Sequence, residues 1–221
     1  MRARRSESEV TAISATDDPT LATLRELLAI AQNGLTFTSD QFDRERYTQL
    51  REIVEELLRA PHSAIPGFDP GAVLGSEKGY ATPKVDVRGA VFRDGRILMV
   101  RERSDGLWTL PGGWAEINQS PSDAIVKEIR EESGFEARTT KLAAVFDRRR
   151  HAHPPSFHHI YKFFFLCELT GGSASHSIET DGVDFFAEEA LPPLSVQRVT
   201  AAQIQTMFRH GRAQDLPTEF D

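Results

Sequence analysis

One stretch decides the fold of this chain: LPGGWAEINQSPSDAIVKEIREESGF, residues 110–135, in which a glycine-rich loop leads into a helix. Ser120 is a good N-cap, and Pro121 suits the first helical position because its missing N–H would have no partner there. Gly134 can adopt the left-handed conformation in which many helices end. These signals predict a helix over residues 121–133.

The predicted helix carries glutamates on one side and apolar residues on the adjoining side. Glu128, Glu131 and Glu132 fall within an arc of ~100° of the helix surface. Like charges at i and i+4, as at Glu128 and Glu132, cost a few tenths of a kcal/mol unless a cation lies between them. Oxygen ligands of this kind suit Mg²⁺, with Mn²⁺ as an alternative. Three glutamates are also typical of a solvated helix face, and residue type alone leaves both interpretations open.

The joint spacing of these residues resembles the Nudix hydrolase signature, G-x5-E-x7-R-E-U-x-E-E-x-G-U, where U is apolar. The matching positions are Gly113, Lys127-Glu128, Glu131-Glu132 and Gly134-Phe135. This resemblance extends over residues 84–214. It implies an α+β fold, an α/β/α sandwich with a mixed sheet, that hydrolyses a nucleoside diphosphate linked to another moiety X.

The resemblance also implies roles for individual residues. Glu128, Glu131 and Glu132 match the catalytic, metal-binding glutamates, and Gly112 matches a loop whose backbone lies close to the metal. Two positions depart from the pattern, because Gln119 stands where Glu is usual and Lys127 where Arg is usual. In the usual pattern these two side chains can form an ion pair. Here we expect the contact to survive at most as a hydrogen bond between the Gln119 amide and the Lys127 ammonium.

Working outward toward the N-terminus, apolar residues at helical spacing predict a pair of helices. The first is expected to stop at Asn33 and Gly34, and the second to be capped by Asp43 and to end before Pro61. Apolar residues between them, including Phe37 and Phe42, are expected to fold back on the pair. Two helices bury little surface alone, so we expect them to pack on the main domain or on a second copy, and we favour a homodimer formed through them.

The rest of the chain completes the predicted organisation. The expected segments are a flexible N-terminus over 1–18, a helical hairpin domain over 19–62, a linker over 63–83, the Nudix domain over 84–214 and a C-terminal tail over 215–221. Strands are expected at 85–92, 97–100, 108–110, 142–147, 160–169 and 183–186, with a closing helix over about 200–210. Asp94-Gly95 is a hairpin signal between the first two strands.

Candidate substrate contacts gather after the central helix. Residues 147–159 hold three consecutive arginines and several histidines, and cations concentrated in an acidic protein attract polyphosphate. From this segment we select Arg148, Arg150 and His153 as substrate-binding residues, although a charged surface loop would look the same. Trp114 can stack on a base or a choline-like cation, or serve packing alone.

The general base that activates water is harder to assign. Glu179 and Asp181 precede the strand at 183–186, a region from which Nudix enzymes often supply an acidic residue, and Glu116 lies in the glycine-rich loop. We rank Glu179 first. A carboxylate on a surface loop is the competing interpretation.

Composition limits the remaining classes. The 221 residues include 26 Lys and Arg against 33 Asp and Glu, which gives a net charge of −7 and argues against a general nucleic-acid coat. No apolar run approaches the ~20 residues needed to cross a bilayer. The single cysteine, Cys167, excludes an internal disulfide and a Cys-rich zinc site, so we expect a cytoplasmic protein with no membrane attachment.

The sequence therefore predicts Mg²⁺-dependent hydrolysis of a pyrophosphate bond. Over residues 21–210 the chain also looks like a bacterial Nudix subgroup with an N-terminal helical domain, commonly labelled ADP-ribose pyrophosphatase and including CDP-choline pyrophosphatases. ADP-ribose and CDP-choline are accordingly the leading substrates. The alternatives are trimming of RNA 3′ ends and a catalytically weak nucleotide-sensing module, the latter suggested by Gln119 and Lys127.

Overall fold

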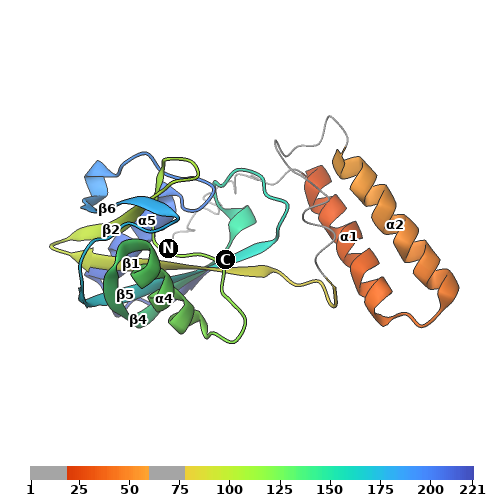
Figure 1. The fold of residues 1–221 in the computed structure, drawn as a ribbon, viewed down its shortest axis with the longest axis horizontal. Helices are drawn as coiled ribbons and strands as arrows, with labels where there is room; N and C mark the ends of the chain where they lie inside the picture. Colours follow the sequence, from red (N-terminus) through yellow and green to blue (C-terminus); the bar gives the residue numbers. More distant parts are fainter. Residues whose placement is uncertain (1–18, 60–77) are drawn as a thin grey trace, which may run out of the picture.

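The computed structural model describes residues 19–59 and 78–221, and these form an α/β body with a separate pair of helices at one end (Figure 1). The predicted flexible segment 1–18 and most of the predicted linker, residues 63–77, lie outside the described residues. None of the helices in the described ranges is long and apolar enough to span a membrane.

The body is built on a mixed sheet of seven strands. They are β1 (Lys84–Arg93), β2 (Arg96–Glu102), β3 (Trp108–Thr109), β4 (Phe135–Asp147), β5 (Ile160–Gly172), β6 (Thr180–Phe186) and β7 (Glu219–Phe220). The strand order is β3-β2-β1-β5-β4-β7, with β6 paired to β2. The β1–β5 and β4–β7 pairs are parallel, and the other pairs are antiparallel.

Helices α4 (Pro121–Ser133) and α5 (Ala201–Arg212) cover opposite faces of this sheet. Alternate residues of β1 show the two sides: Val91 packs in the core with Ile125 of α4, whereas Ala90 packs in the core with Ile204 of α5. Side chains of a strand alternate between faces, so β1 is apolar over residues 89–92, where both of its faces are covered. This arrangement confirms the α/β/α sandwich.

The helix that the sequence defined best has the predicted ends. The Ser120 side chain accepts a hydrogen bond from Asp123 N, Pro121 is the first residue of α4, and Gly134 ends it at φ 75°. The Asp94-Gly95 hairpin also forms, with both residues at positive φ.

Two predicted ends of the N-terminal helices are wrong, namely the stop of the first and the cap of the second, whereas the second helix ends before Pro61, at Arg59, as predicted. Helix α1 (Pro19–Phe37) continues through Gly34, because that glycine lets α1 approach α2 (Gln41–Arg59): a Cβ there would lie 2.5 Å from the Tyr47 ring. The cap of α2 is Asp40, whose side chain accepts from Asp43 N at 2.9 Å. Asp43 itself lies inside the first turn.

The apolar residues between these helices do not fold back on the pair. Phe37 and Phe42 are 70% and 68% exposed, because the extension of α1 carries Phe37 outward. The pair instead has its own small core, formed by Leu21, Leu24, Val54 and Leu58, against which Phe157 of the body packs. Two hydrogen bonds connect α1 to the chain entering β1: Gln32 Nε2 to Gly79 O, 2.9 Å, and Ala81 N to Asn33 Oδ1, 2.7 Å.

The closing helix and the C-terminal segment also extend beyond the predicted elements. Helix α5 is capped by Thr200 and runs past Gly211 to Arg212. Within the segment expected as a C-terminal tail, β7 adds to the edge of β4. The short 3-10 helices η1 (Arg148–Arg150) and η2 (Glu188–Ala190) complete the described elements.

Candidate active site

The glycine-rich loop is fixed along β1 by backbone hydrogen bonds. Val87 N donates to Gly113 O at 2.8 Å, and Ala115 N donates to Val85 O at 2.9 Å. Gly112 has φ 140°, and a Cβ there would lie 2.0 Å from Val87 O. Only glycine fits that position, because a side chain would collide with the neighbouring backbone.

Two of the three predicted glutamates face this loop. Glu132 is 5% exposed, and its Oε2 accepts a hydrogen bond from Gly112 N at 2.8 Å. Glu128 is half-buried, and its Oε1 lies 3.2 Å from where a Gly113 Cβ would be. Glu131 is exposed, with its Oε2 3.8 Å from Lys127 Nζ. The structure therefore brings Glu128 and Glu132 together with the glycines and leaves Glu131 outside.

Burial controls the charge of these two glutamates. It raises the pKa of Glu132 to about 8, although the Arg88 guanidinium and the Gly112 amide oppose that shift. Burial also raises the pKa of Glu128, against the attraction of Arg88. A carboxylate in such a site is stabilised as an anion by any cation that approaches it.

A buried cluster of charges faces the same site, and sequence reasoning missed it. Asp86 accepts two hydrogen bonds from Arg88, at 3.0 and 2.8 Å, and one from Lys162 Nζ at 2.6 Å. Burial disfavours the Asp86 anion, yet Arg88 and Lys162 together lower its pKa to about 2. Asp86 and Lys162 are direct partners in the β1–β5 register, and Arg88 lies two residues along on the same face. The available signal was the charged residues among the apolar ones, Asp86 and Arg88 in the first strand and Lys162 in the other.

Glu132 and the Asp86, Arg88 and Lys162 cluster line one cavity of about 340 Å³, and Glu128 lies outside its described lining, beside Gly113. Its lining comprises Asp86, Arg88, Glu102, Gly112, Gly113, Trp114, Glu132, Arg148, Ile160, Lys162, Glu179, Gln197 and Arg198. Glu102, at the end of β2, is also buried and lies 3.1 Å from Arg198 Nε. The cavity thus places buried carboxylates and buried cations around the same space.

The predicted substrate contacts separate into two groups. Arg148 is buried in the cavity wall and donates to Gln197 Oε1 at 2.8 Å, while Trp114 is 47% exposed at the cavity. Glu179 is exposed and also lines the cavity. In contrast, Arg150 is exposed outside the described lining, and His153 is buried with its Nδ1 2.7 Å from Val196 O.

The donor set fits a hard divalent cation. Glu128 and Glu132 are one helical turn apart, and both turn their oxygens toward the Gly112-Gly113 backbone. Carboxylate and backbone oxygens are the ligands that Mg²⁺ prefers, and Mg²⁺ completes its shell with water or phosphate. In residues 19–59 and 78–221, no three His, Cys, Asp or Glu side chains are already gathered around one point. The protein alone therefore supplies a partial shell.

The expected Gln119–Lys127 contact is not the one observed. Lys127 Nζ donates instead to Glu116 Oε2 at 2.9 Å, and Gln119 Nε2 donates to the same oxygen at 3.1 Å. This hydrogen bond from Lys127 raises the pKa of the lysine. An ion pair between loop and helix is therefore retained, with its carboxylate three residues earlier than the Nudix pattern places it.

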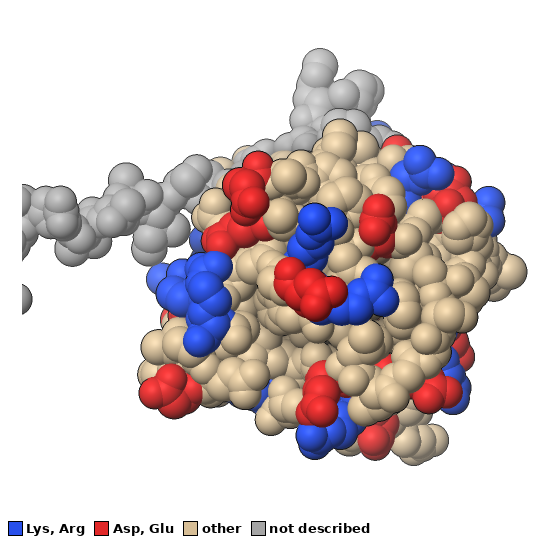
Figure 2. Space-filling view, turned by 90° about the vertical axis from the view of Figure 1, so that its left-hand side faces the viewer, with Lys and Arg blue, Asp and Glu red and all other residues tan. Residues whose placement is uncertain are grey.

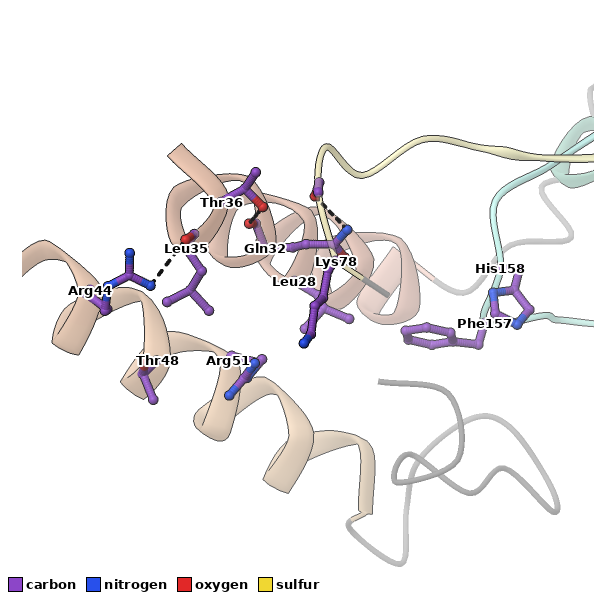
Figure 3. A pocket seen from close by; sticks show the side chains of 11 residues that line it. Leu28, Gln32, Leu35, Thr36, Arg44, Thr48, Arg51, Lys78, Phe157 and His158 are labelled. Atoms are coloured by element: carbon purple, nitrogen blue, oxygen red, sulfur yellow. Dashed lines mark hydrogen bonds between the residues drawn. The ribbon is translucent and has the colours of Figure 1, made fainter. Parts of the chain in front are cut away.

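A larger cavity, of about 490 Å³, lies between the helix pair and residues 78–79 and 157–158 (Figure 3). Figure 3 shows the side chains of Leu28, Leu35 and Phe157 beside those of Arg44 and Arg51. The described lining holds no acidic residue. It therefore lacks ligands for a hard cation, and the smaller cavity is the candidate active site.

Family models match both parts of the chain. The NUDIX domain model matches residues 82–206, and the model of the UDP-X-like, N-terminal oligomerisation domain matches residues 18–65. Among curated relatives, the Bacillus subtilis (strain 168) protein named "Putative ADP-ribose pyrophosphatase YjhB" is 46% identical over 197 residues, which are 89% of this chain and 94% of the relative.

Solved structures agree with this assignment. A crystal structure of UDP-X diphosphatase is 37% identical with a TM-score of 0.61, covering 91% of this chain and 97% of that one. An ADP-ribose pyrophosphatase from Streptococcus suis 89-1591 is 38% identical with a TM-score of 0.59, covering 63% of this chain and all (100%) of that one. The chain therefore belongs to the Nudix hydrolases, and a domain of the UDP-X-like oligomerisation family precedes its Nudix domain.

Proposed function

We propose that this enzyme hydrolyses the pyrophosphate bond of a nucleoside diphosphate linked to X, with Mg²⁺ as its cofactor. The observation that carries the proposal is the cavity whose lining includes buried Glu132 together with buried Arg148 and Lys162. A diphosphate needs cations for its charge, and the carboxylates suit the metal that accompanies it. ADP-ribose and CDP-choline remain the leading substrates, and the names of the relatives add UDP-linked compounds.

Glu128, Glu132 and the backbone oxygen of Gly112 would hold Mg²⁺. Glu131 would join them only by leaving Lys127, which its side chain faces at 3.8 Å. When bound, the ion supplies charge neutralisation of the phosphates and a lower pKa for water. Mn²⁺ prefers similar oxygen ligands and would substitute.

The cationic side of the cavity binds the substrate phosphates. Lys162 donates one hydrogen bond to Asp86, and an ammonium has three hydrogens to donate. Arg148 is fixed by Gln197, so its guanidinium is already oriented at the cavity wall. These two side chains would pair with the negative charge of the bound phosphates.

Glu179 is the proposed general base. It lines the cavity from an exposed loop, whereas Glu102 is buried and ion-paired with Arg198. Glu179 would take a proton from the attacking water as the new P–O bond forms and the bridging P–O bond breaks. The products are a nucleoside monophosphate and phosphorylated X.

Trp114 would contact the nucleoside or the X group. Its indole is half exposed at the cavity, and the His158 ring lies edge-on at 6.2 Å between centroids. A flat base or a choline-like cation can stack on an indole face. The group that it contacts determines which substrate class the enzyme prefers.

A panel of substrates tests the proposal directly. The protein is incubated with Mg²⁺ and ADP-ribose, CDP-choline, UDP-sugars or dinucleotides, and the products are identified. We expect a monophosphate and phospho-X from at least one of them. Nucleotide binding in calorimetry with no product from any substrate would contradict hydrolysis and favour the sensing module.

Labelled single-stranded RNA forms the other arm of the panel, and we expect it to remain intact. At the end of the body farthest from the helix pair, acidic and basic side chains are interspersed with no continuous basic surface (Figure 2). A backbone-tracking site needs such a surface. Shortening of the RNA would contradict the small-molecule assignment.

We further propose that the helix pair joins two copies of this chain in the cytoplasm. The family description of this segment as an oligomerisation domain supports the assignment. So do its exposed apolar residues, which are Ile30, Phe37, Phe42, Ile53 and Leu57. The cytoplasmic location rests on the lone thiol of Cys167, which is buried and whose pKa burial raises to about 12.

A further inference from the structure

In the glycine-rich loop, the carboxylate of Glu116 accepts hydrogen bonds from two other side chains. Glu116 Oε2 accepts hydrogen bonds from Lys127 Nζ at 2.9 Å and from Gln119 Nε2 at 3.1 Å. The backbone closes a turn at the same place, because Gln119 N donates to Glu116 O at 3.3 Å and Asn118 has φ 68°. The turn and the amide together hold the carboxylate toward α4.

Both ends of the Glu116–Lys127 ion pair lie next to groups of the active site. The residue before Glu116 is Ala115, whose N–H is fixed on β1. The residue after Lys127 is Glu128, whose Oε1 faces Gly113. The ion pair therefore connects loop and helix close to the place where the glycines face the carboxylates.

We propose that Glu116 is a positioning residue that holds the glycine-rich loop in register with α4 through Lys127. The proposal rests on the proposed function, because the register matters only if Gly112 and Gly113 work with Glu132 and Glu128. Gln119 occupies the position where the Nudix pattern has its carboxylate. In this chain it acts as a second donor to Glu116.

This role is separable from global stability. The Glu116 and Lys127 side chains are 58% and 29% exposed, and ion pairs at such sites contribute little to folding. The backbone hydrogen bonds of the loop to β1 do not depend on them. Loss of the ion pair should loosen the loop locally, and small misplacements of catalytic groups have large effects on rate.

Glu116→Gln tests the role, because glutamine has nearly the same size but no charge. We expect kcat to fall about tenfold while KM changes less than about twofold. In the metal-free protein, the amides of residues 112–119 should exchange with deuterium at least about threefold faster. The melting temperature should change by less than about 2 °C.

A rescue and a matched control accompany this variant. In Glu116→Gln with Gln119→Glu, the carboxylate returns to the position that the Nudix pattern gives it, where the present amide shares the Glu116 oxygen with Lys127, and kcat and slow exchange should recover. Glu168→Gln removes another exposed carboxylate, 53% exposed and paired with Arg138 between β4 and β5. It should leave both readouts unchanged.

The outcomes separate this inference from the proposed function. If the wild type turns over a substrate and E116Q matches it in kcat and exchange, Glu116 has no positioning role and the hydrolase assignment stands. A double variant as slow as E116Q would also contradict the role. If the wild type hydrolyses nothing, the proposed function fails, and the exchange of the metal-free loop still tests the contact: unchanged exchange in E116Q overturns it.

Discussion

Glu132 illustrates how one buried side chain can serve the chemistry at the expense of the fold. It accepts one hydrogen bond from Gly112 N and is almost fully buried. Burial raises its pKa to about 8, so the folded protein does not favour its charge. A strongly shifted pKa beside a cavity is typical of functional residues, which is consistent with the proposed metal-binding role of Glu132.

Glu132→Gln should therefore lower kcat on the order of 100-fold, the cost of removing one preorganised charged group. The amide oxygen of glutamine can still accept from Gly112 N, so the melting temperature should stay the same or rise. Glu131→Gln is the matched comparison on the same helix, and its loss should be smaller because Glu131 is exposed. Steady-state kinetics and thermal melting would check this, and equal losses in the two variants would contradict the assigned geometry.

His153 leads to a prediction about acid stability. Burial, together with the positive charges of Lys162 and Arg148, lowers its pKa to about 3, against its hydrogen bond to Val196 O. The unfolded chain takes up a proton below pH ~6.5 while the folded chain does not, so stability falls as the pH falls through that value. Between pH 7 and pH 5 this loss is about 2 kcal/mol.

His153→Asn removes the titration and keeps an N–H that can donate to Val196 O. The variant should lose about 2 kcal/mol less than the wild type between pH 7 and pH 5, whatever its stability at pH 7. Urea denaturation at both pH values measures the difference. Identical losses in the two proteins would show that His153 is protonated in the folded state.

Much of the candidate site followed from residue spacing, and the remainder required the sheet. Glu128 and Glu132 lie on one face of α4, and the glycine-rich loop directly precedes this helix in the sequence. A local sequence pattern could therefore identify them. The cluster of Asp86, Arg88 and Lys162 forms only when β1 and β5 pair, and no spacing within the sequence reports that register. His153 was selected for its residue type, which says nothing about burial.

For helices and strands, local sequence signals predict where each element ends, and tertiary contacts explain where the observed ends differ. Helix α4 has both a side-chain cap and a left-handed glycine, and its predicted ends are confirmed. Gly34 looked like a helix stop, but it is a contact point with α2, and the difference depends on a residue thirteen positions away. Strand β4 begins earlier than predicted because its first half alternates polar and apolar residues and pairs with β5.

The C-terminal residues brace the segment that carries Arg148. Strand β7 pairs with the end of β4, and the Asp221 side chain accepts from Asp147 N at 2.5 Å and contacts His151 Nε2 at 3.1 Å. Asp147 in turn caps η1, the short helix that begins at Arg148. This chain of contacts sets the place of a predicted phosphate-binding side chain.

Asp221→Ala should therefore raise KM for the diphosphate substrate about threefold to tenfold, with kcat changed less than about twofold. The reason is that these contacts position Arg148, which binds the substrate, and do not position the proposed metal-binding glutamates. Phe220→Ala, at a neighbouring residue that is 78% exposed, is the control and should behave as the wild type. Steady-state kinetics would check both. A fall in kcat with KM unchanged would contradict a role in substrate binding.

At the scale of the whole molecule, the helix pair is too small to bury its own apolar surface. Ile53 and Leu57 lie one turn apart on α2 and are 48% and 51% exposed. A second copy that packs there would remove this surface from water.

Ile53→Glu with Leu57→Glu should convert a two-copy assembly into single chains in analytical ultracentrifugation, because buried unpaired charges oppose association. Ile178→Glu, which replaces an apolar residue 92% exposed on the body, should leave the assembly intact. A wild type that sediments as a single chain at micromolar concentration would contradict the dimer.

Glu128 and Glu132 are proposed to hold a divalent cation beside a diphosphate. A crystal structure with Mg²⁺ and a non-hydrolysable nucleoside diphosphate analogue tests it most directly. We expect the ion about 2.0–2.1 Å from oxygens of both glutamates, with the phosphates extending toward Arg148 and Lys162. An ion bound elsewhere, or a diphosphate outside this cavity with both carboxylates unliganded, would contradict it.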